Sequence, residues 1–273
     1  MTAAAPRPLG LAHFTVLDVP PLDLVMLAAR TGWAAIGIRL IQTAPGTPVY
    51  ALPAGSADMR EMRRRLDGEG VRVHDIEIAT IGVDFSAACL APVLESAAEL
   101  GAARLSVCGD DPDAARLAAS FAGLCDLAAG FGIGVDLEWM AWRPVGRLAD
   151  AVAAVTAAAR PNGAVLVDAL HLFRTGGSPT DLTALPPGTI RSVQLCDAVA
   201  EAPAGTEAII REARSGRLPP GEGVLPLDAL MAALPEDAAL SAEVPMGTET
   251  PPEERARRVY AATRALVERR RAG

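Results

Sequence analysis

Four oxygen-bearing side chains stand at or near the ends of four consecutive apolar runs in the second half of the chain. They are Glu138 after VDL, Asp168 after VLV, Gln194 within SVQLC and Glu243 after LSA. Three of them are carboxylates, which repel one another at close range unless a cation lies between them. An all-oxygen set favours Mg²⁺ or Mn²⁺, with Co²⁺ and Zn²⁺ as less favoured occupants. The pattern predicts one divalent metal ion, provided that the fold brings the four residues together.

Each acidic residue also has an ordinary structural explanation. A single carboxylate at a strand end is more often a helix N-cap or a solvated loop charge. Asp168 in particular is well placed to cap a helical turn over residues 169–174. The metal hypothesis depends on the series, because four consecutive strands carry oxygen ligands at the same end.

Three further polar residues are candidates for the same place. His171 follows Asp168 by three residues, so one helical turn brings both to one side, where the histidine would act in catalysis or support a ligand. As a lone histidine it would be an ordinary core or surface residue. Arg39 and Glu77 come at or near the ends of the second and third expected strands. Arg39 would bind a carboxylate or phosphate of a substrate, or else form a salt bridge that only neutralises Glu77.

Short apolar runs alternate with longer amphipathic, alanine-rich runs along the whole chain. Strands are expected at 11–17, 35–40, 71–78, 104–108, 133–138, 164–168, 190–196 and 239–243. Helices are expected at 22–30, 57–66, 87–100, 113–129, 145–159, 169–174, 207–213, 225–234 and 253–271. This alternation predicts parallel strands joined by right-handed crossovers. We therefore predict a single-domain α/β protein, a (β/α)₈ TIM barrel over residues 11–273 preceded by a disordered segment 1–10.

A doubly wound open sheet is the rival architecture. Such a sheet usually has a glycine-rich turn after its first strand, and this chain has none there. The glycines of residues 130–134 precede a strand instead of following one, so they are not a dinucleotide-binding turn. The barrel is the better prediction, and in a barrel the strand ends converge at one mouth where catalytic groups lie.

The composition argues against several classes of protein. The chain contains no lysine, so Schiff-base aldolases, pyridoxal-phosphate enzymes, P-loop NTPases and Ser-x-x-Lys acyltransferases lose an essential amine. A net charge of −8 argues against a nucleic-acid partner. We expect no membrane span and no signal peptide. The four cysteines form no C-x-x-C pair, and we expect buried free thiols in the reducing cytoplasm.

Five short motifs occur in a fixed order: VDLE (135–138), VDALH (167–171), VQLCD (193–197), RLPPGEG (217–223) and SAEVP (241–245). From about Leu11 to the last helix, the chain resembles the xylose isomerase-like superfamily, which contains sugar and sugar-phosphate isomerases, epimerases and related dehydratases. Each motif is weak by itself, but together in this order they are fairly specific. The resemblance implies that Glu138, Asp168, Gln194 and Glu243 are the metal ligands, that His171 lies near the substrate, and that Arg217 contacts it.

The resemblance also implies the chemistry. A metal-binding carboxylate, Glu138 or Glu243, would remove a proton next to a carbonyl through an enediolate, as a sugar or sugar-phosphate isomerase or epimerase does. Loss of a β-hydroxyl, with His171 as proton donor, would instead give a lyase similar to 3-dehydroshikimate dehydratase. Gln194 departs from many isomerases and epimerases, which carry histidine there, whereas some dehydratase-like members carry glutamine.

The isomerase or epimerase is the first expectation and the dehydratase the alternative. The partner would be a small-molecule sugar, sugar phosphate, cyclic polyol or keto acid, and a homo-oligomer is compatible with the sequence. A three-zinc DNA-repair nuclease on the same barrel would need many histidines, and the chain has three. A barrel that only binds a ligand would require a broken metal set.

Overall fold

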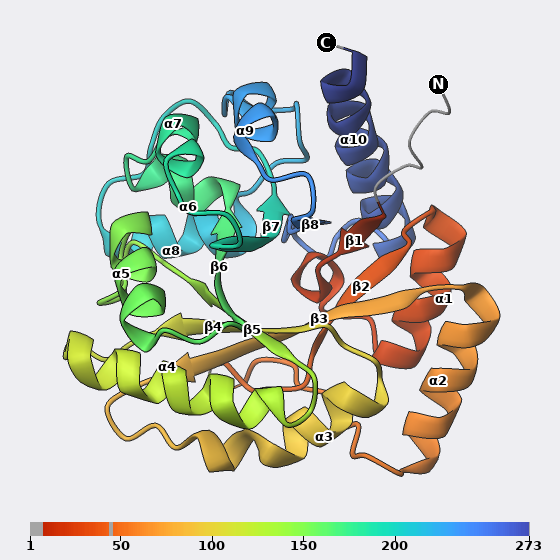
Figure 1. The fold of residues 1–273 in the computed structure, drawn as a ribbon. Helices are drawn as coiled ribbons and strands as arrows, with labels where there is room; N and C mark the ends of the chain where they lie inside the picture. Colours follow the sequence, from red (N-terminus) through yellow and green to blue (C-terminus); the bar gives the residue numbers. More distant parts are fainter. Residues whose placement is uncertain (1–7, 44–45, 273) are drawn as a thin grey trace, which may run out of the picture.

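The chain forms a closed barrel of parallel β-strands with helices on its outside (Figure 1). The structure is a computed structural model and describes residues 8–43 and 46–272. Within these residues eight strands pair in sequence order, and the first pairs with the last: β1 Leu9–Leu11, β2 Ala35–Arg39, β3 Arg72–Ile81, β4 Arg104–Gly109, β5 Gly134–Glu138, β6 Gly163–Asp168, β7 Ile190–Leu195 and β8 Ala239–Ala242. The predicted (β/α)₈ barrel is confirmed.

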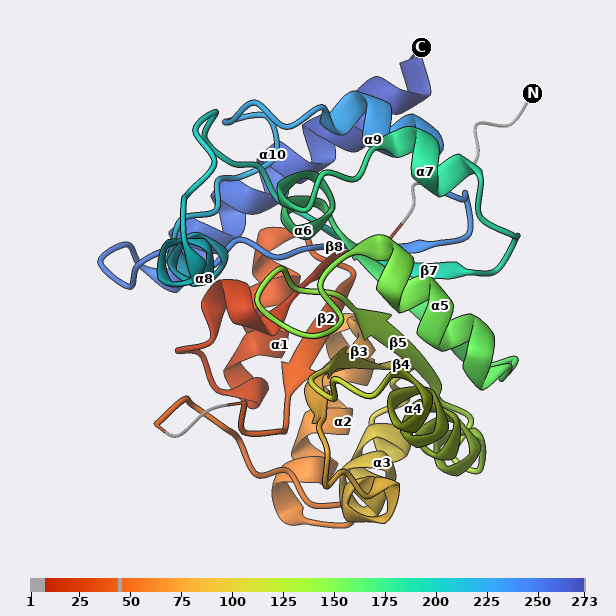
Figure 2. The same cartoon turned by 90° about the vertical axis from the view of Figure 1, so that its left-hand side faces the viewer.

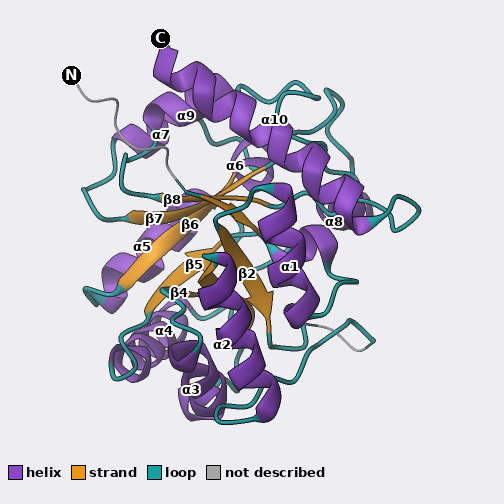
Figure 3. Cartoon of the chain, turned by 90° about the vertical axis from the view of Figure 1, so that its right-hand side faces the viewer, coloured by secondary structure: helices purple, strands orange, loops and turns teal. Residues whose placement is uncertain are grey.

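Helices surround these strands on the outside (Figures 2 and 3). The α-helices of the described residues are α1 Pro21–Thr31, α2 Ala57–Glu69, α3 Ala91–Glu99, α4 Ala114–Ala129, α5 Leu148–Ala158, α6 Ala169–Arg174, α7 Pro179–Thr183, α8 Thr206–Ser215, α9 Leu227–Ala233 and α10 Pro252–Ala272. The last helix packs against the first, where the indole of Trp33 donates to the carbonyl of Ala256 at 3.2 Å. No helix among the described residues is long and apolar enough to cross a membrane.

The strands from β4 to β8 are buried along nearly their whole length. One face of each strand packs on the barrel interior and the other on the helices, which is why parallel strands have continuous apolar sequences instead of alternating ones. This continuity makes the polar residues at the strand ends conspicuous in the sequence.

The first strand lies earlier than predicted. A strand was expected at 11–17, but β1 spans Leu9–Leu11, and a short 3₁₀ helix, η1, follows at His13–Val16. The reason is that the Thr15 hydroxyl donates to the carbonyl of Ala242 at 3.1 Å and accepts from the amide of Val244 at 3.0 Å. The segment after β1 therefore turns across the end of β8. Since Leu9 and Gly10 are in a strand, the predicted disordered segment 1–10 extends too far, and residues 1–7 lie outside the described residues.

The prediction of four buried cysteines needs correction, and one short helix was not predicted. Cys89 is exposed, because it lies in the surface 3₁₀ helix η2 (Ala87–Leu90), whereas Cys108, Cys125 and Cys196 are buried; all four thiols are free. The short helix α7 was not predicted. It begins at a capping box in which Ser178 and Asp181 satisfy each other's backbone amides.

Candidate metal centre

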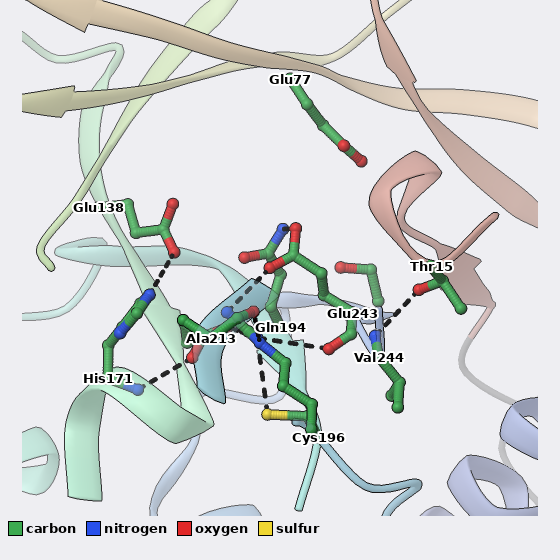
Figure 4. A network of polar contacts seen from close by, with 12 residues as sticks. Thr15, Glu77, Glu138, His171, Gln194, Cys196, Ala213, Glu243 and Val244 are labelled. Carbon is green, nitrogen blue, oxygen red and sulfur yellow. Dashed lines mark hydrogen bonds and ion pairs between the residues drawn. The ribbon is translucent and has the colours of Figure 1, made fainter. Parts of the chain in front are cut away.

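Strand register brings the predicted ligands to one level of the barrel mouth. Asp168 of β6 pairs with Gln194 of β7, and Gln194 pairs with Ser241 of β8, two residues before Glu243. Glu138 is the last residue of β5. Oxygen atoms of Glu138, Asp168 and Glu243 all lie within 4.8 Å of one another. Figure 4 shows the side chains of Glu138, Gln194 and Glu243 converging on one space above His171.

This set of oxygens fits a divalent cation. Mg²⁺ binds oxygen at about 2.0–2.1 Å, so ligands on opposite sides of one ion are about 4 Å apart. Gln194 offers a fourth oxygen: its Oε1 is buried and has no hydrogen-bond partner in the described part of the chain, while its Nε2 donates to Glu243 Oε1 at 3.2 Å. Leaving a buried acceptor unsatisfied costs about 1–3 kcal/mol. A cation would satisfy that oxygen and neutralise the three carboxylates.

Asp168 is both a helix cap and a member of the cluster. Its Oδ1 accepts the backbone amide of His171 at 2.9 Å, which caps α6 as the ordinary explanation predicted. Its Oδ2 forms an ion pair with the Arg217 guanidinium. The cap fixes the direction of the carboxylate, so the two explanations do not compete.

Arg217 lies directly against the expected metal ligands. It is 4 % exposed, its Nε donates to the carbonyl of Ala213 at 2.9 Å, and its guanidinium is also 3.2 Å from Glu243 Oε2. Pairing with two ligands neutralises part of their charge. The resemblance implied that Arg217 contacts substrate, and the structure places it in the wall of the same cavity.

Asp197 holds the segment that carries Arg217, and it was not among the predicted site residues. It is 1 % exposed, and its carboxylate accepts the amides of Ala198, Gly221 and Leu225 at 2.8–2.9 Å. Its backbone also pairs with Leu218, the neighbour of Arg217, in both directions. The signal was present in the sequence, because the motifs QLCD and PPGEG each contribute to this contact.

Burial controls the protonation of the carboxylates. Together with the negative charges of Glu243 and Asp168, burial raises the pKa of Glu138 well above its ordinary value. Burial also raises the pKa of Glu243 to about 7, although Arg217 acts in the opposite direction. Burial acts to raise the pKa of Asp168 as well, but Arg217 and His171 outweigh it, and that pKa is lowered. Without a cation the site thus contains a carboxyl group that exchanges its proton near neutral pH.

His171 is a neutral imidazole inside the cavity. Burial lowers its pKa to about 4, against the opposing attraction of Asp168. Its Nε2 lies 3.7 Å from Glu138 Oε1 (Figure 4). Because the histidine is uncharged near pH 7, this contact is not an ion pair. The edge-on ring of Trp142, 5.3 Å away between centroids, helps to hold the imidazole.

Arg39 and Glu77 line the opposite wall and are in contact with each other. Their closest side-chain atoms are 3.5 Å apart, so the predicted salt bridge forms, but it is long. Glu77 Oε1 accepts the backbone amide of His13 at 2.7 Å, and the His13 ring accepts the amide of Arg39 at 3.0 Å. The contacts of His13 with Glu77 and Arg39 were not predicted, because they depend on the 3₁₀ helix η1, which was not predicted either.

The cavity between these walls has a volume of about 230 Å³. Of the predicted site residues, Arg39, Glu77, Glu138, His171, Gln194, Arg217 and Glu243 line it. Asp168 lies beneath them and is fully buried. The mouth of the barrel therefore gathers all eight predicted residues, and the volume suits a small molecule better than a polymer.

The fold is a closed (β/α)₈ barrel, and three carboxylates and an amide at the C-terminal ends of its strands form a cluster that could hold a metal ion. The sequence profile of the xylose isomerase-like TIM barrel family matches residues 26–266. The chain belongs to this family. Among curated proteins, none matches the sequence.

Several solved structures are similar to this chain in fold. The IolI protein with a bound zinc atom has a TM-score of 0.80 at 17 % identity, over 96 % of this chain and 98 % of that one. The probable 3-DHS dehydratase AsbF from Bacillus anthracis has a TM-score of 0.72 at 13 % identity, over 94 % and 98 %. A D-allulose 3-epimerase from Methylomonas sp. in complex with D-allulose has a TM-score of 0.69 at 16 % identity, over 95 % and 97 %. At these identities the likeness establishes the fold.

Proposed function

We propose that this protein is a divalent-metal-dependent isomerase or epimerase of a sugar or sugar phosphate. The observation that carries the proposal is the cluster of three buried carboxylates around the unpartnered amide oxygen of Gln194. The proposed ligands are Glu138, Asp168, Gln194 and Glu243, and the all-oxygen set favours Mg²⁺ or Mn²⁺. The zinc in the IolI structure and the D-allulose in the epimerase structure support a metal and a sugar on this type of barrel.

Two carboxylates have the properties required of a base. Glu138 and Glu243 stand on different sides of the open space in Figure 4 and both line the cavity. A general base must lie within reach of the proton that it removes, and both carboxylates border the space in which a substrate would bind. One carboxylate would remove a proton next to the substrate carbonyl. Return of the proton to the neighbouring carbon gives isomerisation, and return to the opposite face gives epimerisation.

The bound cation would act as a Lewis acid toward the carbonyl and hydroxyl oxygens of the substrate. The chain's own residues then have separate tasks. Arg217 holds Asp168 and Glu243 in place, and His171, neutral beside Glu138, can accept or donate a proton within the cavity.

A dehydratase acting on a cyclic hydroxy-ketone acid is the second candidate. Gln194 favours it, since the resemblance associates glutamine at this position with dehydratase-like members, and AsbF is similar in fold. The first proton abstraction is the same in both reactions. The difference is the leaving hydroxyl, which His171 would have to protonate.

One experiment separates the two reactions. The manganese-loaded protein is incubated in deuterium oxide with ketoses, their phosphates and 3-dehydroshikimate, and the products are analysed by mass spectrometry. The proposal expects a product of unchanged composition that contains one solvent deuterium. Loss of water from the acid alone, with new ultraviolet absorbance, would replace the isomerase by the dehydratase. Glu243→Gln is the control, because it removes both a ligand and a base.

A further inference from the structure

Arg39 is a buried cation whose hydrogen-bonding capacity is only partly used. The residue is 5 % exposed, and its Nε is buried without a hydrogen-bond partner among the described residues. The guanidinium lies over the ring of Phe14, 4.5 Å from the ring centroid, which fixes its plane against one wall. A buried guanidinium normally forms several hydrogen bonds to acceptors.

Glu77 does not account for this cation. The closest approach of the two side chains is 3.5 Å, at the outer limit of a hydrogen bond. The other oxygen of Glu77 already accepts the amide of His13 at the shorter distance of 2.7 Å. The carboxylate is thus held mainly by η1, and Arg39, which lines the cavity, has only this long ion pair within the described residues.

Two more arginines line the same cavity. Arg143, in the segment after β5, is bound to Asp110 at 3.0 Å, but its Nε is also buried and unpartnered in the described chain. Arg214 of α8 is exposed and forms no ion pair within residues 8–43 and 46–272. With a divalent ion bound, the ion and Arg217 together balance the three ligand carboxylates, while Glu77 faces Arg39 and Asp110 faces Arg143. Arg214 is then the arginine of the cavity lining that has no ion pair among the described residues.

We propose that the substrate carries an anionic oxygen group, a carboxylate or a phosphate, and that Arg39 binds it. The proposal rests on the proposed function and narrows its substrate class from sugars in general to sugar acids and sugar phosphates. Arg39 donates from the part of its guanidinium that lines the cavity, with Phe14 against one face, and the exposed Arg214 adds positive charge at the rim. A neutral sugar would leave Arg39 with no anionic partner other than the long contact to Glu77.

Binding to the manganese-loaded protein tests the proposal without requiring turnover. The probes are D-fructose, D-fructose 6-phosphate and D-gluconate, and their dissociation constants are measured by calorimetry. Because Arg39 would form charge-assisted hydrogen bonds with an anionic group, we expect at least one anionic probe to bind about 10- to 100-fold tighter than D-fructose. A preference for the phosphate or for the gluconate identifies the group.

Arg39→Gln should reduce this preference by about tenfold or more and leave manganese binding unchanged. Arg39→Lys, which keeps the charge but not the fork, should restore part of it even if the glutamine variant folds poorly. Arg258→Gln removes a surface arginine that pairs with Glu222 and is the matched control. Equal binding of all three probes, no measurable binding of either anion, or an unchanged preference in Arg39→Gln overturns the inference. If the preference for an anionic probe is lost in Arg39→Gln but wild type converts none of the tested substrates, the anion site stands and only the proposed reaction is wrong.

Discussion

Glu243→Gln should stabilise the metal-free protein at alkaline pH while it abolishes metal binding. The pKa of Glu243 is raised from its ordinary 4.5 to about 7 by burial. An acid with a raised pKa binds its proton more tightly in the fold than in the unfolded chain. Its contribution to stability is therefore complete below pH 4.5 and is lost as the pH rises through about 7.

The size of the effect follows from the two pKa values. Each unit of pKa corresponds to about 1.4 kcal/mol, so the ionised carboxylate costs up to about 3 kcal/mol at pH 8. Glutamine resembles the protonated acid in shape and carries no charge. The variant should exceed wild type by less than about 1 kcal/mol at pH 5 and by up to about 3 kcal/mol at pH 8. Mn²⁺ at one hundred times its dissociation constant should stabilise wild type by about 3 kcal/mol. It should not stabilise the variant, which has lost a ligand.

Urea denaturation at pH 5 and pH 8, with chelator or with Mn²⁺, measures both effects. Glu212→Gln is the matched control, because Glu212 is also buried but forms two hydrogen bonds with Arg174, at 2.6 and 3.0 Å. That variant should be less stable than wild type and keep the response to Mn²⁺. The reasoning is refuted if Glu243→Gln is destabilised at pH 8 in chelator, or if Mn²⁺ stabilises it as much as it stabilises wild type.

Three other substitutions test single contacts. His171→Ala should keep the fold and manganese binding but slow solvent-deuterium exchange into substrate by about 100- to 10,000-fold; unchanged exchange would make the histidine a packing residue. Asp197→Ala removes the acceptor of three backbone amides, one in a buried and two in part-buried hydrogen bonds, and should cost about 1–3 kcal/mol in urea denaturation, with weaker substrate binding because Arg217 loses its support. In Gly37→Ala the new Cβ would lie 2.1 Å from Glu77 Oε1, so this carboxylate must move. A lower melting temperature and weaker substrate binding should follow, and neither would change if the side chain simply swings aside.

Most of the proposed metal ligands could be located from the sequence because three of the four sit where an apolar strand stops. In a barrel the strand ends share one mouth, so identifying the strand and its end is enough to place Glu138, Asp168 and Glu243. Gln194 is not the last residue of its strand. It lies beside these carboxylates because it pairs with Asp168 in the barrel. No long-range contact had to be guessed for this part of the site.

The support of the site could not be predicted in the same way. Asp197 and Arg217 are brought together by a loop. The path of this loop depends on three backbone amides that donate to the Asp197 carboxylate, and no periodicity in the sequence predicts it. The contact of His13 with Glu77 needs a 3₁₀ helix, whereas the apolar run around it has the composition of a strand. Both cases involve backbone groups as partners, and a backbone amide has no residue type by which a sequence could reveal it.

One side of the cavity lacks a positive charge, and the other side lacks a hydrogen-bond acceptor. The presence of both in one cavity supports a function for it. On one side, raised carboxyl pKa values and the unpartnered oxygen of Gln194 indicate that a positive charge is missing. On the other side, the unpartnered Nε of Arg39 indicates that an acceptor is missing. If packing alone were required, the two groups could have been paired with each other, or replaced by apolar residues at little cost to stability. They are instead held apart, Glu243 by Arg217 and Arg39 by Phe14. A cation and an anionic substrate, bound together, would satisfy both.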